Sequence, residues 1–382
     1  MKYVIDDGFF IDEFKKYFES SNINFLLGSG CSIDAIATLG NLEKDLTDLI
    51  KKYSISQDKR ILEQICNKLN NFIGSAIIPS DRLLKNEFTE NDGIGKTKRN
   101  YIEFLNVIYS LLLNRGSTIL PKKINIFTTN YDLFLEVAAE SLKIPYNDGG
   151  IGIFKRHFSS KNFQRRIYRL SESYLYEYEE PNVNIIKLHG SLNWKLEENP
   201  DSILVSNRIE CEFLEEKHIE ENGYIKKDSK VPIILPTKQK FVRTLMEHTY
   251  YDLARLYSNE LEREQSVLFC SGFSFEDEHI RTITQRGLNN PFLTLFVFPF
   301  SYNDEQKILS YFETHNNVKV IRINNVNSNG NEVLSEAEEV QKYKISLAQK
   351  GMSDENRVNI DFVMLINILK TVLNKVSESG RF

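Results

Sequence analysis

The sequence predicts an α/β protein built on a doubly wound, Rossmann-like sheet that is mostly parallel. Short runs of continuously apolar residues recur along the chain, as expected of parallel strands that are buried on both faces. Segments with apolar residues at helical spacing lie between these runs. The alternation of the two patterns indicates helices that cover both faces of one sheet.

The composition agrees with a folded chain of this kind. The 382 residues are 41% hydrophobic and 12% aromatic, which is enough for a full core and argues against disorder. The net charge of −5 argues against wholesale wrapping of nucleic acid, although a local basic patch that contacts nucleic acid stays open. No apolar run approaches the ~20 residues that span a bilayer. The amino terminus lacks a basic segment followed by a long apolar run, so we expect a cytoplasmic protein without a signal peptide.

The first strand is predicted at residues 23–27, after a helical segment at 11–18 and before a glycine turn. Six more apolar runs are predicted as strands, at residues 124–128, 183–188, 231–235, 266–270, 292–298 and 318–323. Polar or glycine-containing motifs follow four of the seven runs. In an open parallel sheet the carboxyl ends of the strands form the edge where ligands bind, so these motifs are the candidate site.

We expect one domain at residues 1–330, which contains the sheet and two insertions. Residues of about 40–115 have helical spacing and are predicted as a helical insertion. Residues of about 195–230 are charged and irregular and are predicted as a surface insertion. Residues 331–382 are predicted as a helical C-terminal appendage.

The appendage carries an apolar stripe at helical spacing. Such a stripe packs either on its own domain or on another subunit, and the spacing leaves both alternatives open. The stripe consists of Phe362, Leu365, Ile366, Ile368, Leu369, Val372 and Leu373.

The four cysteines, Cys31, Cys66, Cys211 and Cys270, are far apart in the sequence. No two of them lie within four residues of each other, so a zinc site built from paired cysteines is not expected. Disulfides are not expected in a cytoplasmic chain. We therefore expect no bound metal.

The first motif is GSGCS at residues 28–32. Its two glycines allow the backbone to approach a phosphate, and the next helix would direct free N–H groups at that phosphate. An ordinary strand–helix turn explains the same residues equally well. The second motif is TTNYD at residues 128–132. Its amide and carboxylate suit a sugar or amide ligand, and a helix cap is the alternative.

The third motif is KLHGSLNW at residues 187–194, and the fourth is CSGFSFED at residues 270–277. A histidine at a strand end is placed to act as a base near neutral pH, although a lone histidine is more often structural. A glycine flanked by serines can line a phosphate or a ribose, or can simply turn the chain.

Taken together, the four motifs resemble the sirtuin-like family, the silent-information-regulator NAD-binding fold, over roughly residues 20–325. The family's glycine–small–glycine–x–serine loop is similar to residues 28–32, and its threonine–x–asparagine–x–aspartate segment to residues 128–132. Its lysine–leucine–histidine–glycine–serine box is similar to residues 187–191, and its glycine–x–serine strand end to Gly272 and Ser274.

The sequence departs from the protein-deacylating sirtuins in two respects. The cysteine pairs of their zinc module are missing, and so is the aspartate–phenylalanine–arginine stretch after the glycine loop, where this chain reads IDAIATL at residues 33–39. The sequence therefore resembles the bacterial anti-phage branch, which hydrolyses NAD+ to nicotinamide and ADP-ribose and thereby depletes the cofactor. A protein deacylase and a non-catalytic nucleotide-sensing or scaffold subunit are the alternatives.

The resemblance implies a role for each site residue. Asn130 would orient water or the ribose, and His189 would accept a proton. Asp132 would bind the nicotinamide amide or fix its loop. The remaining predicted NAD+ contacts are Gly28, Ser29, Gly30, Ser32, Thr128, Gly272, Ser274 and Asn324.

The resemblance also implies assembly with other chains. Sirtuin-like anti-phage proteins generally form homo-oligomers, and an enzyme that drains NAD+ needs restraint. We expect a homo-oligomer and a sensing partner, either a HerA-like ring ATPase or a short Argonaute.

Overall fold

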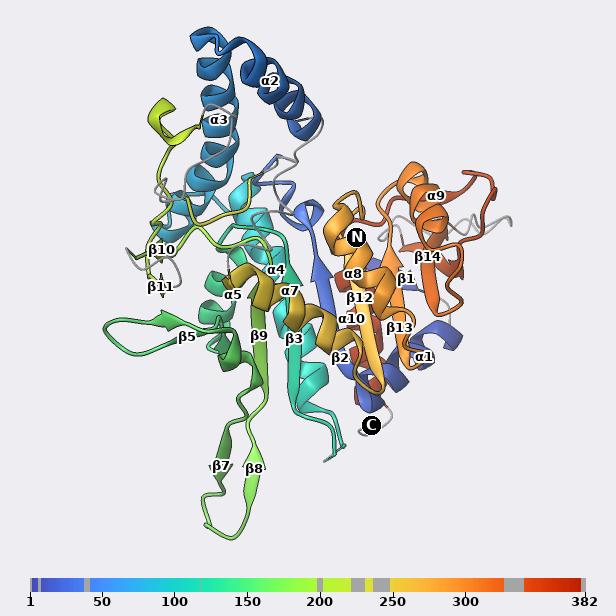
Figure 1. Cartoon of the computed structure of the whole chain (residues 1–382). Helices are drawn as coiled ribbons and strands as arrows, with labels where there is room; N and C mark the ends of the chain where they lie inside the picture. Colours follow the sequence, from blue (N-terminus) through green and yellow to red (C-terminus); the bar gives the residue numbers. More distant parts are fainter. Residues whose placement is uncertain are drawn as a thin grey trace.

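A ten-stranded sheet forms the centre of the molecule, seen in Figure 1. The computed structural model describes residues 2–5, 8–37, 42–117, 119–197, 202–220, 231–235, 248–325 and 340–378. The strand order is β1-β15-β14-β13-β12-β2-β3-β9-β4, and β16 also pairs with β14. The strands from β14 to β4 are parallel, whereas β15 and β16 run antiparallel to β14. The predicted doubly wound α/β fold is thus confirmed.

The bounds of the strands in this sheet are β1 Lys2–Ile5, β2 Asn22–Leu27, β3 Lys123–Thr128, β4 Tyr146–Asn147, β9 Asn182–Lys187, β12 Ser266–Ser271, β13 Leu293–Phe298, β14 Val318–Asn325, β15 Val340–Leu347 and β16 Arg357–Val358. From β2 the chain moves through β3 to β9 on one side, then returns to β12 on the other side of β2 and continues to β13 and β14. The direction of winding therefore reverses between β2 and β12, which is the position where open α/β sheets bind ligands.

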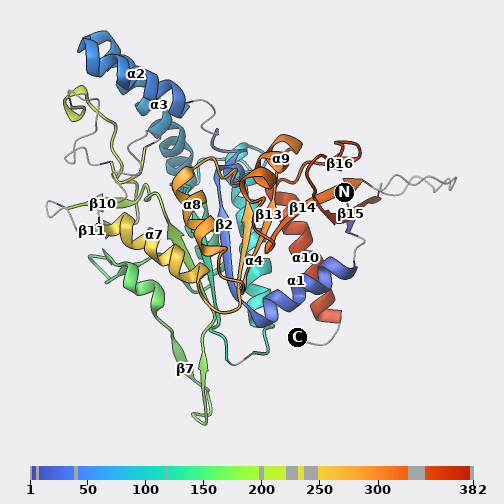
Figure 2. The ribbon, with the colours of Figure 1, turned by 45° about the vertical axis from the view of Figure 1, so that its right-hand side comes forward.

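Helices cover both faces of the sheet. One face packs against α1 (Gly8–Ser20), α4 (Gly93–Leu113), α5 (Phe134–Leu142) and α10 (Phe362–Glu378). The other face packs against α7 (His248–Leu261), α8 (Glu278–Gly287) and α9 (Tyr302–Tyr311). Figures 1 and 2 show the sheet between the two groups of helices. No described helix has the length and apolar character needed to cross a membrane.

The predicted helical region of about 40–115 contains α2 (Leu42–Ser56), α3 (Lys59–Leu84) and α4. Of these, α4 packs into the core of the sheet, whereas α2 and α3 extend beyond the sheet, as Figures 1 and 2 show. The buried faces of α2 and α3 form a separate apolar cluster with side chains from residues 209–219 and 231–235.

Small sheets and short turns occupy the rest of the described chain. A four-stranded sheet has the order β10-β11-β6-β5, and a two-stranded sheet consists of β7 and β8. Part of the predicted charged insertion, residues 198–201 and 221–230, lies outside the described residues. The bounds are β5 Gly150–Ile151, β6 His157–Phe158, β7 Tyr168–Leu170, β8 Glu177–Glu179, β10 Trp194–Leu196 and β11 Ile203–Val205, with 3-10 turns η1 Ser29–Ser32, η2 Ser160–Gln164 and η3 Glu216–His218.

One predicted strand is wrong. Residues 231–235 are buried, but within the described residues their β pairing is an isolated antiparallel bridge between Ile233 and Gly190. Pro232 has no N–H to give to a ladder, and its carbonyl instead accepts a hydrogen bond from the Tyr250 hydroxyl at 2.9 Å. The apolar character of this run reflects burial against α2 and α3 rather than strand pairing.

The C-terminal region is part of the core. Its predicted boundary at 330/331 lies outside the described residues, and β15 was not expected within it. In β15 the buried Tyr343 and Ile345 alternate with Lys344 and Ser346, a period-two pattern rather than a continuous apolar run.

The apolar stripe of α10 packs on its own domain, against the core formed with α1 and α4. The subunit-interface alternative for this stripe is therefore wrong. Phe362, Leu365, Ile366, Ile368, Leu369 and Val372 are buried, and Leu373 is half-buried.

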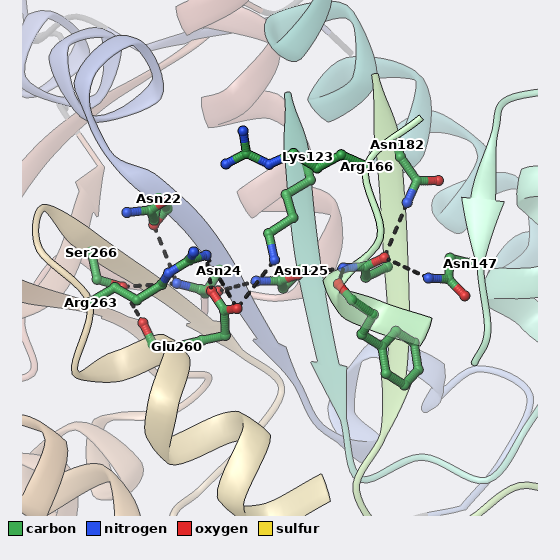
Figure 3. Close-up of polar contacts among 12 residues, drawn as sticks. Asn22, Asn24, Lys123, Asn125, Asn147, Arg166, Asn182, Glu260, Arg263 and Ser266 are labelled. Atoms are coloured by element: carbon green, nitrogen blue, oxygen red, sulfur yellow. Dashed lines mark hydrogen bonds and ion pairs between the residues drawn. The ribbon is translucent and has the colours of Figure 1, made fainter. Parts of the chain in front are cut away.

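A row of buried asparagines crosses the sheet near the amino ends of its strands, as Figure 3 shows. Asn24, Asn125 and Asn184 stand in register on β2, β3 and β9. The Asn125 amide donates to Asn24 Oδ1 at 2.9 Å, and the Asn184 amide donates to Asn125 Oδ1 at 2.8 Å. Asn147 on β4 extends the row by donating to Asn184 Oδ1 at 3.2 Å. We call these four residues the amide ladder; because its members satisfy one another, the sheet can bury them.

We expect Asn125→Ala to lower the free energy of unfolding by about 1–3 kcal/mol, because it leaves Asn24 Oδ1 buried without that donor. Urea unfolding would measure the change. The matched control is Asn182→Ala, since Asn182 is half-buried and donates to the same ladder from its margin at 3.1 Å. An equal loss in both variants, or no loss in Asn125→Ala, would mean that the ladder does not stabilise the sheet.

Candidate active site

The four sequence motifs meet at one cavity of about 480 Å³. It lies at the carboxyl ends of β2, β3, β9 and β12, at the point where the winding of the sheet reverses. Leu27 stands in register with both Thr128 and Ser271, so the segments after these strands leave the sheet at the same level. The predicted site residues that line the cavity are Ser29, Gly30, Ser32, Asn130, Asp132, His189, Gly272 and Ser274.

The loop after β2 packs backbone to backbone on the loop after β12. The Gly28 N–H donates to Ser271 O and the Gly30 N–H donates to Gly272 O, each at 3.0 Å. A Cβ on Gly28 would lie 2.3 Å from Gly272 O, and Gly272 itself has φ +65°. The glycines are therefore required by the contact between the two loops.

This contact corrects the expected role of the first motif. Gly28 is followed by η1, a 3-10 turn of four residues, and not by a helix that directs free N–H groups at a phosphate. The Gly30 N–H is already bonded to Gly272 O, and the Cys31 N–H donates to Gly28 O at 3.0 Å. The residues of this loop that line the cavity are the exposed Ser29, the half-buried Gly30 and the buried Ser32, so contacts to a ligand from this loop come from them.

Asn130 is held in a network of buried polar groups. Its amide nitrogen lies within hydrogen-bond distance of Gly28 O (3.1 Å), Ser32 Oγ (3.3 Å) and the Tyr101 hydroxyl (3.4 Å). Its backbone N–H donates to Thr128 Oγ1 at 3.0 Å. These contacts fix the orientation of the Asn130 side chain at the cavity wall.

Asp132 belongs to the same network and has both carboxylate oxygens engaged. Ser32 Oγ donates to Asp132 Oδ2 at 2.9 Å, and the Phe134 N–H donates to Oδ1 at 3.3 Å. The Lys187 ammonium donates to the Asp132 carbonyl and pairs with Glu136 at 2.9 Å. These bonds support the loop-fixing alternative for Asp132.

Burial dominates the electrostatics of this network. It raises the pKa of Asp132 and of Glu136, and the Lys187 ammonium opposes both shifts. Burial, followed by the Asp132 charge, raises the pKa of Tyr101 well above its usual value. The Tyr101 hydroxyl is therefore protonated at neutral pH and serves as a hydrogen-bonding group.

His189 faces a carboxylate across the cavity wall. Its Nε2 lies 3.6 Å from Asp277 Oδ2, and the side chains of both residues are largely buried. Asp277 also caps α8, because its Oδ1 accepts from the N–H groups of His279 and Ile280. The ring of Tyr131 stacks on the imidazole at a centroid distance of 6.5 Å. A histidine with one nitrogen turned to a carboxylate has the arrangement of an oriented general base.

Three predicted contact residues do not line the cavity. Thr128 Oγ1 donates to Leu27 O at 2.8 Å, and Gly28 lies behind the loop contact. Asn324 accepts from Arg322 at 3.1 Å and lies 3.3 Å from Ser346 Oγ. The structure thus gives these residues supporting positions and does not bring Asn324 to the site.

Sequence reasoning missed several residues of the site. Tyr101 lies in the middle of α4, where its spacing matches that of the core, and Asp277 is also an ordinary helix cap. Asp361 and Phe362 line the cavity although they belong to the region predicted as an appendage. Asp304, at the start of α9, also lines it. Asp277 is the last residue of the fourth motif, and the position of its carboxylate after a strand end was the one signal in the sequence that could have identified it.

Within the described ranges, no group of three or more histidine, cysteine, aspartate or glutamate residues is placed to hold a metal ion. The four cysteines are buried thiols. Burial raises the pKa of Cys31 and of Cys270, so neither is an activated thiolate.

Comparison with known families matches residues 124–321, slightly more than half of the chain, to a family described as SIR2-like domain. The matched segment includes Asn130, His189 and Gly272. No curated protein matches the chain.

We expect Gly272→Ala to destabilise the protein by more than the roughly 1–3 kcal/mol of a strained backbone conformation. The new Cβ would lie 2.6 Å from Cys31 N, so the two loops would have to separate. Gly351→Ala is the control, because Gly351 has φ +80° with nothing within 4 Å of the added Cβ. Chemical denaturation would compare the two, and equal losses would contradict the importance of the loop contact.

Proposed function

Because the chain belongs to the SIR2-like domain family, we propose that it binds NAD+ and hydrolyses the nicotinamide–ribose bond. The family implies NAD-related chemistry, and hydrolysis is the reaction that the site supports best. The observation that carries the proposal is that Asn130 and His189 line one cavity where the winding of the sheet reverses. The products would be nicotinamide and ADP-ribose.

The residues of the cavity fit such a substrate. Its volume of about 480 Å³ is in the usual range of about 300–1,000 Å³ for small-molecule sites. Its wall combines apolar side chains such as Ile33 and Phe300 with the hydroxyl groups of Ser29 and Ser274. Apolar surface suits the flat rings of a dinucleotide, and hydroxyl and backbone groups suit its riboses and phosphates.

The positively charged nicotinamide ring of NAD+ is already a good leaving group. The protein therefore has to position the ribose and the attacking water and to accept the proton of that water. Asn130, fixed by its three hydrogen-bond partners, orients the water or the ribose. His189 accepts the proton that water loses as its oxygen bonds to the ribose carbon. The electron pair of the broken bond stays with nicotinamide. The buried wall around both residues limits the access of other water molecules.

Asp277 is a positioning residue in this scheme. Its Oδ1 is engaged by the start of α8, which leaves Oδ2 directed at His189 Nε2. The carboxylate would hold the imidazole in one orientation and favour a proton on Nε2.

The resemblance to anti-phage proteins suggests the biological role. We propose that this protein acts in the cytoplasm and depletes NAD+ during infection. It would do so as a homo-oligomer that is restrained by a HerA-like ring ATPase or, alternatively, by a short Argonaute. Co-purification with the product of a neighbouring gene is the observation that would identify the partner.

We expect Asn130→Ala and His189→Ala each to lower NAD+ hydrolysis by at least about 10²-fold, because each removes a positioning or proton-accepting group. Chromatography of nicotinamide and ADP-ribose would measure turnover, with the protein's normal partner present if it is needed. Asn324→Ala, which changes an asparagine outside the cavity, should stay within a few-fold of wild type.

Variants of Asn130 and His189 that fold and turn over within a few-fold of wild type would remove both residues from the mechanism. If wild type releases nicotinamide only when an acylated peptide is added, the deacylase reading replaces hydrolysis. If wild type binds NAD+ without turnover under all of these conditions, the scaffold reading replaces it.

We expect Asp277→Asn to lower kcat about tenfold, as the loss of a group that orients a histidine does, and to shift the acid limb of the pH–rate profile to lower pH. Asparagine caps a helix about as well as aspartate, so α8 should stay intact. The shift follows because the lost carboxylate no longer favours the protonated imidazole, and the base is free at lower pH. Asp304→Asn removes a different carboxylate from the cavity and should leave the acid limb in place. A profile unchanged in Asp277→Asn would rule out the positioning role.

A further inference from the structure

The exposed apolar side chains of this molecule are concentrated in one short region. Twenty large hydrophobic side chains are exposed in the described part of the chain, and ten of them lie between residues 151 and 178. Ile153 is 88% exposed and Phe154 is fully exposed at the tip of the β5–β6 hairpin. Seven of the ten come after Phe154 in the sequence, and these seven lie on β7, β8 and the residues beside them. These seven share one ribbon, and a patch of this kind marks an interaction surface rather than ordinary surface apolarity.

We call residues 165–180 the arm. The arm contains β7, β8 and the turn between them, and it extends well away from the body of the molecule in Figures 1 and 2. Its most exposed apolar residues are Leu175 (83%) and Tyr174 (79%) in the turn. The arm leads directly into the amino end of β9, whereas the cavity lies at the carboxyl end of that strand, so the two features are on opposite edges of the sheet.

The arm is held together by few contacts of its own. β7 pairs antiparallel with β8 and with no other described strand. Arg169 pairs with Glu180 at 2.7 Å, and Arg166 lies 3.8 Å from Glu179. A two-stranded ribbon is only marginally stable in water, and both of its outer edges offer unpaired N–H and C=O groups. Further strands added to these edges would stabilise it.

The two edges of the arm carry opposite charge. The β7 side has Arg165, Arg166 and Arg169 without an acidic residue. The β8 side has Glu177, Glu179 and Glu180 without a basic residue. The edge of β7 is therefore complementary to the edge of β8, and every copy of the chain presents both.

We propose that the arm joins copies of this chain side by side, with β7 of one copy pairing antiparallel with β8 of the next. A two-fold contact between two β7 edges would bring arginines against arginines, and one between two β8 edges would bring glutamates against glutamates. Pairing of unlike edges is heterologous, so it builds a ring or an open row rather than a closed two-fold dimer. All arms then point the same way, and the exposed apolar side chains of adjacent arms pack side by side along the extended sheet.

The backbone identifies where each edge can be blocked. The Glu180 N–H donates to Ile167 O and the Ser171 N–H donates to Tyr176 O, which places these residues in hydrogen-bonded pairs. In an antiparallel ladder the alternate residues turn their N–H and C=O groups outward, and these include Tyr168 on β7 and Glu177 on β8. Proline at either position removes an outward donor without removing a donor from the arm's own ladder.

The test uses the full chain at micromolar concentration in sedimentation velocity. Wild type should sediment as an assembly, Tyr168→Pro and Glu177→Pro should each be monomeric, and their equimolar mixture should form one-to-one heterodimers. The mixture retains one free edge of each kind, which allows a single junction. Ile55→Ser, which changes an 87% exposed residue on α2, should leave the wild-type assembly unchanged. Circular dichroism would establish that each variant is folded.

Three results would overturn the proposal. A monomeric wild type would show that the arm does not join copies of this chain, and would leave the surface to another protein. Dimers formed by one blocked variant alone would indicate a two-fold contact between like edges. An assembly that survives both substitutions would lie elsewhere on the molecule. None of these results depends on NAD+ hydrolysis, so assembly and activity can fail separately.

Discussion

The direct contact between two backbone loops is the constraint on which the site depends. The loop after β2 and the loop after β12 approach so closely that Gly28 and Gly272 have no space for a side chain. The Gly28 carbonyl, held in this position, then accepts the Asn130 amide, and Asn130 and Ser32 in turn contact Tyr101. The position of the polar network around Asn130 therefore depends on a contact between two backbone segments, to which no side chain contributes. A wider separation of the loops would disturb each of these bonds.

The sequence predicted the parts of the fold that have a continuous apolar pattern. Strands β2, β3, β9, β12, β13 and β14 are buried on both faces, and their runs stand out for that reason. β15 was missed because only alternate residues are buried, and residues 231–235 were misassigned because burial against helices gives the same apolar run. A pattern of hydrophobicity indicates that a segment is buried. It identifies a strand only when the neighbouring strand with which the segment pairs is also known.

The sequence likewise predicted some residues of the candidate site and missed others. Motifs at strand ends located Asn130 and His189 at the cavity, since carboxyl ends of parallel strands share one edge. Tyr101 could not be found, because a tyrosine at helical spacing is usually a core residue, and only the fold brings its hydroxyl to Ser32. Asp361 and Phe362 were missed because they begin the helix that was expected to lie outside the domain. Their position makes α10 both a layer of the core and part of the cavity wall.

The amide ladder has a consequence for the opposite end of the strands. Parallel strands can slip by two residues and still present the same side chains to each face, a shift of about 7 Å along the strand. Hydrophobic burial alone scarcely distinguishes such registers. A slip that moved Asn125 toward the carboxyl ends of its neighbours would set it beside Leu26 and Ile186 and remove its partners, whereas Asn22 and Asn182 stand two residues the other way. The amide ladder thus fixes the register of these strands. By fixing which residues of β3 and β9 stand level near their starts, it sets the heights at which Asn130 and His189 emerge at the other edge.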